Sequence, residues 1–120
     1  MRIVNTTGAL GEDLACEYLK SKGYKIIERN FRKKYQEIDI IALHNKILVF
    51  VEVKTRKTSS FGTPFESIDS WKLKHLIALA QFYKMLNPKL PDDMRIDAIG
   101  VTLNGAKLEK IEHLENITGF

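Results

Sequence analysis

The chain has 120 residues, of which 44% are hydrophobic and 28% are charged, and its net charge is +4. These values are typical of one globular domain spanning residues 1–120, with no linker or repeat. No apolar run reaches the roughly 18 residues of a transmembrane helix and the first ten residues lack a signal-peptide core, so we expect a cytoplasmic protein without membrane contact.

The first predicted element is a helix that Thr6 or Thr7 caps and that runs to about Lys22, where Gly23 ends it. Glu12 falls inside the apolar stripe of this helix, and a carboxylate facing a core is costly unless a partner pairs with it. Glu12 can also be read as a first-turn residue that favours the helix dipole. The flanking Gly11 lets the start of the helix approach another element closely.

A strand is predicted from Tyr24 to Phe31, followed by a basic turn from Arg32 to Tyr35. The segment 20–34 contains seven Lys or Arg residues against Glu28 alone. Such a cluster suits a polyanionic partner such as nucleic acid, although a lysine-rich solvated surface gives the same pattern.

The segment Glu37–Arg56 predicts a hairpin of two apolar strands with charged residues in unusual places. Asn45 and Lys46 are expected to form a two-residue turn, because Asn tolerates the left-handed backbone that such turns require. In that register Asp39 faces Glu52 on one side of the sheet, roughly 4.5–5.5 Å apart between Cβ atoms. On the same side Ile41 faces Phe50 and Glu37 faces Lys54.

Two facing carboxylates on a buried hairpin need a shared proton, a nearby cation or a bound metal ion. Lys54 supplies one cation on the predicted face. The alternative is an ordinary ion pair between Glu52 and Lys54 at the end of a strand, with Asp39 on an exposed edge.

The remaining elements are a loop at Lys57–Pro64, a long helix from Asp69 or Ser70 to Asn87, and two final strands. The helix has a broad apolar stripe that includes Trp71, and its aromatic residues are interpreted as core. Lys72 and Lys74 stand in its first turns, where either can reach a phosphate. Asn104-Gly105 predicts a hairpin between strands at Arg95–Leu103 and Leu108–Leu114. The order αβββαββ predicts an α/β domain with a mixed sheet.

Zinc chemistry is not indicated. The single Cys16 cannot form an internal disulfide, which agrees with a reducing compartment. The three histidines show no zinc-type spacing with one another or with Cys16.

The first helix (GALGEDLACEYLKSKGY), RNFR, EIDII, FVEVKTR, FG and RIDAI together resemble the YraN-type family of endonuclease-like proteins. This family is similar to the PD-(D/E)xK nucleases, a superfamily with a restriction-endonuclease-like αβββαβ core. The resemblance therefore implies that core for this chain, with an extra C-terminal strand and a mixed central sheet flanked by helices. The match departs in two places. Gln36 stands where the family often has Gly, and Ile38 stands where the superfamily has Pro.

The resemblance implies that Asp39 and Glu52 hold Mg²⁺ or Mn²⁺, with the Val53 carbonyl as a further ligand, and that Lys54 acts on the attacking water. Archaeal Holliday-junction resolvases of similar fold use a helix glutamate, which implies a catalytic role for Glu12. Basic residues around this site are predicted to contact nucleic acid, namely Arg32, Lys33, Lys34, Arg56 and Lys72.

We therefore expect a metal-dependent endonuclease acting on DNA, including branched or structured forms. A nucleic-acid-binding module without turnover is the alternative, and a structural domain with an acidic salt-bridge network is a third. The choice between DNA and RNA stays open. A homodimer is also considered, since cleavage of a junction requires two active sites.

Overall fold

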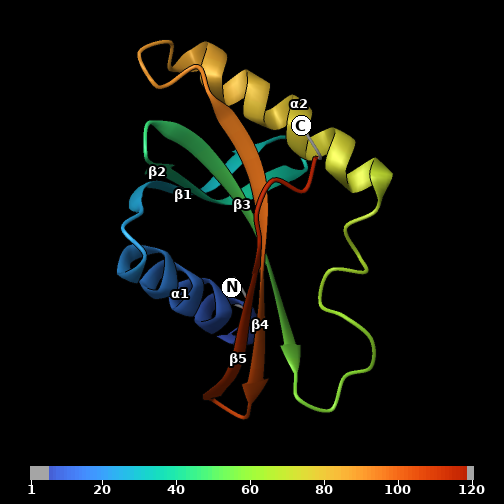
Figure 1. Cartoon of the computed structure of the whole chain (residues 1–120). Coiled ribbons are helices and arrows are strands. Elements are labelled where there is room, and N and C mark those ends of the chain that lie inside the picture. The colour runs from blue at the N-terminus through green and yellow to red at the C-terminus, as the bar shows by residue number, and fades with distance from the viewer. Residues whose placement is uncertain (1–5, 119–120) are drawn as a thin grey trace, which may run out of the picture.

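A computed structural model describes residues 6–118, which form two helices and five strands in the expected order (Figure 1). Residues 1–5, part of the segment in which no signal-peptide core is expected, lie outside this range. Within residues 6–118 no helix is long and apolar enough to cross a membrane. The elements are α1 (Thr6–Ser21), β1 (Lys25–Lys33), β2 (Gln36–His44), β3 (Ile47–Lys57), α2 (Ser70–Leu86), β4 (Met94–Asn104) and β5 (Lys107–Leu114).

The five strands form one mixed sheet in the order β1-β2-β3-β4-β5. Strands β3 and β4 run parallel, and the other neighbouring pairs are antiparallel. Helix α1 packs on one face through Ala15, Cys16 and Leu19, and helix α2 packs on the opposite face (Figure 1). The prediction of an α/β domain whose mixed central sheet is flanked by helices is therefore confirmed. Strand β3, which carries Glu52 and Lys54, lies at the centre of the sheet.

Helix α1 ends at Ser21, within one residue of the predicted limit at Lys22, and Gly23 adopts φ = +89° two residues after it. A side chain at Gly11 would collide with Thr55 of β3. The start of the helix therefore lies directly against the central strand. This contact brings the neighbouring Glu12 towards the end of the sheet where β3 continues beyond its pairing with β2.

The β2–β3 hairpin has the predicted turn. Asn45 and Lys46 both have positive φ (49° and 64°), and Ile41 pairs with Phe50 as expected. The β2–β3 pairing ends, however, at Ile40 and Val51. Beyond this point the two strands diverge, and we call the opening between Asp39 on β2 and Glu52–Lys54 on β3 the fork.

The prediction that Glu37, Asp39, Glu52 and Lys54 share one face of the sheet is wrong. Ile38 packs in the core on the α2 side, whereas Ile40, two residues later, packs on the α1 side. Strict alternation would place both on one face, so the alternation of β2 is broken at Asp39. As a result Glu37 contacts residues on the α1 side, and Glu52 contacts α2.

Two boundaries and one burial prediction also differ. Strand β1 extends to Lys33, so Arg32 and Lys33 are strand residues and only Lys34 and Tyr35 form the turn. Strand β3 continues to Lys57 because it stays paired with β4 along its whole second half. Trp71 was predicted in the core but is 66% exposed. It stands in the first turn of α2, before the residues that cover the sheet, which are Leu76, Leu79, Ala80 and Tyr83.

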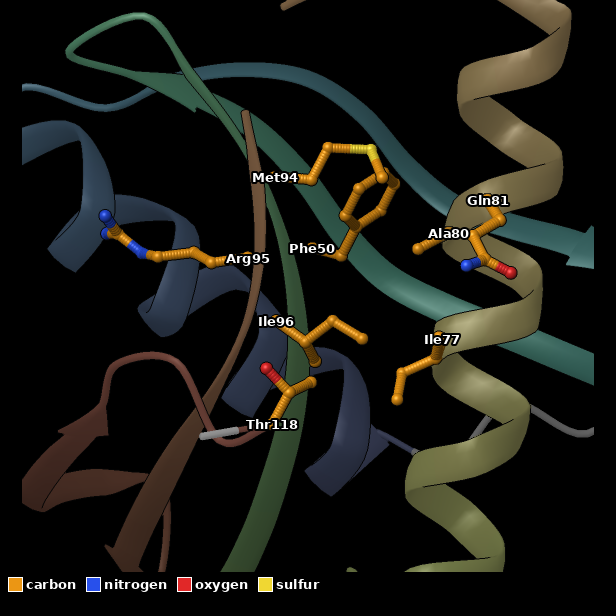
Figure 2. A pocket seen from close by; sticks show the side chains of 8 residues that line it. All are labelled: Phe50, Ile77, Ala80, Gln81, Met94, Arg95, Ile96 and Thr118. Carbon is orange, nitrogen blue, oxygen red and sulfur yellow. The ribbon is translucent and has the colours of Figure 1, made fainter. Parts of the chain in front are cut away.

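Away from the fork, α2 and β4 enclose an apolar pocket, and Figure 2 shows Phe50, Ile77 and Ile96 pointing towards one another, whereas the Arg95 side chain extends away from them. On the other face of β4, the fully buried Asp97 accepts hydrogen bonds from Arg95, from His113 and from the main-chain N–H of Asn116. This network fastens the end of β5 and the segment after it to β4. The pocket is lined by Phe50, Ile77, Ala80, Gln81, Met94, Arg95, Ile96 and Thr118.

Candidate active site

The fork is held open by a side chain that replaces a main-chain partner. The N–H of Val53 donates a hydrogen bond to Asp39 Oδ2 at 2.7 Å, where a regular ladder would supply a carbonyl oxygen of β2. Val53 was predicted to contribute its carbonyl to a metal site. The contact observed here comes from its N–H, and that contact orients the Asp39 carboxylate.

Asp39 and Glu52 meet in the fork, as predicted. Burial, the hydrogen bond to Glu52 and the charge of Glu52 together raise the pKa of Asp39 to about 9, while the Val53 N–H opposes the shift. The nearby charge of Glu12 raises it further. Near neutral pH the Asp39 carboxyl group therefore keeps its proton in the metal-free protein, hydrogen-bonded to Glu52.

Glu52 is the more buried member of the pair, at 5% exposure. Its Oε2 has no hydrogen-bond partner, although Lys72 Nζ of α2 lies 3.3 Å away. The ammonium group is within ion-pair distance but lacks the alignment of a hydrogen bond. A buried carboxylate oxygen in this state has an unused lone pair available for a cation.

Lys54 stands two residues beyond Glu52 on β3 and is half-buried. Within residues 6–118 its ammonium group has no hydrogen bond or ion pair. Lys54 is thus a cation at the fork that is not used to neutralise either carboxylate. The alternative, an ion pair between Glu52 and Lys54, is not formed; Glu52 pairs instead with Lys72 of α2.

Glu12 reaches the same region through a chain of polar contacts on the α1 side. Asn30 donates one amide hydrogen bond to Glu12 Oε1 (2.8 Å) and one to Glu37 Oε1 (2.6 Å). Asn30 has φ = 55°. It lies opposite Asp39 of β2, because Arg29 pairs with Ile40 and Phe31 pairs with Ile38. Glu12 therefore has the partner that its position in the apolar stripe required.

Sequence reasoning missed Asn30 as a member of this cluster. An Asn within a predicted strand, in the motif RNFR, is the signal that could have identified it, because Asn adopts positive φ more readily than most residues. Glu37 was noticed only as a residue facing Lys54, whereas it binds Asn30 and Arg32.

The basic residues predicted to contact nucleic acid lie around the fork in different states. Arg32 forms an ion pair with Glu37 (2.9 Å), and Lys33 lies over the ring of Phe82. Lys34 is exposed in the β1–β2 turn. Arg56 is bound to Thr102 and to the carbonyl of Gly62, so its guanidinium fixes the loop after β3.

The fork fits a small divalent cation that keeps much of its water. No three His, Cys, Asp or Glu side chains within residues 6–118 form a metal site by themselves. Mg²⁺ is commonly held by one or two carboxylates, with water and substrate phosphate completing its shell. Asp39 and Glu52 supply two hard oxygen ligands, and Glu52 Oε2 is buried without a hydrogen bond. The donor set suits Mg²⁺ or Mn²⁺ and not a thiolate- or imidazole-bound metal.

Comparison with known proteins identifies relatives that span almost the whole chain. A protein of Caldanaerobacter subterraneus subsp. tengcongensis is 45% identical over 120 residues, covering 97% of this chain and 98% of its own. A protein of Alkaliphilus oremlandii is 47% identical over 111 residues, covering 91% and 94%, and one of Thermotoga petrophila is 47% identical over 106 residues, covering 88% and 91%. All three are named as UPF0102 proteins. Residues 11–101, which include most of α1 and the fork, match the family described as "Uncharacterised protein family UPF0102", and the chain belongs to this YraN-type family.

Proposed function

We propose that this chain is a metal-dependent endonuclease with a restriction-endonuclease-like core that hydrolyses phosphodiester bonds in DNA, including branched or structured DNA. One observation carries the proposal. Half-buried Asp39, whose pKa is raised to about 9, meets buried Glu52, which has an oxygen without a hydrogen bond, and Lys54 beside them pairs with neither.

Each residue of the fork has a chemical role in this proposal. Asp39 and Glu52 hold Mg²⁺ or Mn²⁺, and the Val53 N–H keeps Asp39 oriented. The bound ion supplies positive charge that activates a water molecule and neutralises the phosphate. Lys54 stabilises the charge that develops during attack, which a preorganised cation does without reorganisation.

Glu12 acts through Asn30, which it positions across from Asp39. The basic residues around the fork draw the DNA backbone towards the carboxylates, since phosphate and carboxylate otherwise repel each other. Cleavage of both strands of a junction requires two active sites, so this proposal includes a homodimer, which light scattering measures directly.

One observation favours a second candidate, a DNA-binding module without turnover. Lys72 lies 3.3 Å from Glu52 and can neutralise the carboxylate in place of a metal ion. In that case the fork is an internal ion pair and the surrounding cations only bind phosphates. The two candidates differ in whether a divalent ion displaces Lys72.

The test combines calorimetry with cleavage assays. We expect one Mg²⁺ or Mn²⁺ ion per chain and cleavage of at least one substrate among single-stranded, duplex, flapped and four-way-junction DNA. Asp39→Asn and Glu52→Gln should each abolish ion binding and cleavage, while Asp13→Asn, an exposed carboxylate bound to Arg29, should leave both unchanged. Tight DNA binding without ion binding or cleavage would instead establish the binding module.

A further inference from the structure

Two large aromatic side chains remain exposed near the fork, although aromatic residues normally contribute most to a core. Tyr35 in the β1–β2 turn is fully exposed, and Trp71 in the first turn of α2 is 66% exposed. Both line one groove between this turn and α2, which we call the aromatic groove. Its other walls include Gln36, Lys72, His75 and Leu79.

The ring of Trp71 is supported in place. It contacts the ring of His75, one turn later, with 4.0 Å between centroids. His75 Nδ1 in turn lies 2.7 Å from the main-chain oxygen of Trp71. A supported ring loses less conformational entropy when a flat ligand stacks on it, which favours binding.

The aromatic groove has cationic side chains at both ends. Arg32 and Lys34 line the adjoining hollow, which shares Tyr35, Gln36 and Glu37 with the groove. Glu37 pairs with Arg32, which leaves Lys34 as the unpaired cation at this end within residues 6–118. At the other end Lys72 lines the groove while its ammonium lies 3.3 Å from Glu52 Oε2. A single side chain thus connects the groove to the carboxylates of the fork.

Exposed aromatic rings within a cationic track are the arrangement that binds single-stranded nucleic acid, with phosphates on the cations and bases on the rings. Bases in an intact duplex are already stacked on one another and cannot occupy such a groove. We propose that the aromatic groove stacks unpaired bases of a DNA strand whose backbone enters the fork, so that the preferred substrate has a single-stranded segment next to the cleaved bond.

This inference rests on the proposed function for the position of the cleaved bond. It does not need metal or turnover for its test, because base stacking can be measured in chelator. Trp71 is the chain's single tryptophan, so intrinsic tryptophan fluorescence reports on the groove alone.

The experiment titrates the full chain, in chelator and at fixed salt, with a 20-nucleotide single strand and with the 20-base-pair duplex containing it. The single strand should quench Trp71 fluorescence, and the duplex should not. By fluorescence anisotropy, Trp71→Ala and Tyr35→Ala should each weaken single-strand binding by about tenfold or more. Duplex binding, which depends on phosphate contacts, should change less than twofold.

Three controls make the result specific. Trp71→Phe and Tyr35→Phe keep an aromatic ring and should retain most of the single-strand affinity. Phe61→Ala removes an equally exposed ring on the loop after β3, outside the groove, and should change nothing. Absence of quenching by the single strand, or equal losses for single strand and duplex, would overturn the inference.

Failure of this inference and failure of the proposed function are distinguishable. Ion binding and duplex cleavage without Trp71 quenching would leave the nuclease standing and remove the aromatic groove. Quenching of Trp71 fluorescence, with a selective loss of single-strand affinity in Trp71→Ala but no ion binding, would establish base stacking in the aromatic groove of a protein that is not a nuclease.

Discussion

Raising the pH should tighten the binding of Mg²⁺ or Mn²⁺ at the fork, because Asp39 holds a proton that the cation must displace. Burial and the hydrogen bond to Glu52 raise the pKa of Asp39 to about 9. Below that pH, each ion that binds releases about one proton. The dissociation constant should then fall about tenfold per pH unit, or about 100-fold between pH 6 and pH 8.

Calorimetric titration of Mn²⁺ at pH 6, 7 and 8 measures this slope. Repeating each titration in two buffers of different protonation enthalpy counts the protons released. Asp13→Asn, which alters an exposed carboxylate outside the fork, should keep the same slope. A dissociation constant that is independent of pH, with no proton passed to the buffer, would refute the raised pKa of Asp39.

The same proton also affects the metal-free protein, with a sign that follows from linkage. The unfolded chain loses it near the ordinary value of 3.8, whereas the folded chain keeps it up to about 9. The folded state therefore binds more protons between these values, so the free energy of unfolding should fall as the pH rises through this window. Saturating Mn²⁺ should weaken or reverse that trend.

Three further outcomes are expected. Lys54→Ala should lower the cleavage rate by about 10²–10³-fold. Its melting temperature in chelator should not change, because Lys54 has no ion pair within the described residues. Unfolding of this variant would show a structural role instead. Asp97→Asn should cost about 3–5 kcal/mol in urea unfolding, because it leaves the mostly buried Arg95 guanidinium without its carboxylate partner. Burial alone would raise the pKa of Asp97, but its three hydrogen bonds lower the pKa below the ordinary value of 3.8. The wild type should therefore lose stability as the pH falls below 3.8, because the Asp97 carboxylate becomes protonated. An equally steep loss of stability at acid pH in Asp97→Asn would contradict this. Neutralising Arg32, Lys33 and Lys34 of the β1–β2 hairpin should reduce the salt dependence of DNA binding by up to about three phosphate contacts. An unchanged slope of affinity against salt concentration would mean that these residues form only a solvated face.

Local signals in the sequence were sufficient for most of the fold. The turn at Asn45-Lys46, the hairpin at Asn104-Gly105 and the limits of α2 each depend on a few neighbouring residues. Asp69 caps α2 by accepting a hydrogen bond from the N–H of Lys72, as its position suggested. Such features are readable because their partners are close in the chain.

The features that sequence reasoning missed depend on contacts between distant elements. The break in the alternation of β2 arises because Asp39 binds the main chain of β3, a contact that no period-2 pattern encodes. Lys72 pairs with Glu52 across two elements. The helical periodicity of α2 identified its apolar stripe but not which turns lie over the sheet, and Trp71 precedes those turns.

The hydrogen bond from Val53 to Asp39 has a practical consequence for spectroscopy. Most amides of β3 are bonded to main-chain carbonyls of β2 or β4, whose charge never changes, whereas this amide is bonded to a titratable group. Its ¹H and ¹⁵N chemical shifts should therefore follow the ionisation of Asp39, and hydrogen exchange at this one position should report opening of the fork separately from opening of the sheet. A single assigned NMR resonance on the central strand can thus record proton loss, ion binding and DNA binding in one sample, without a label on the ligand.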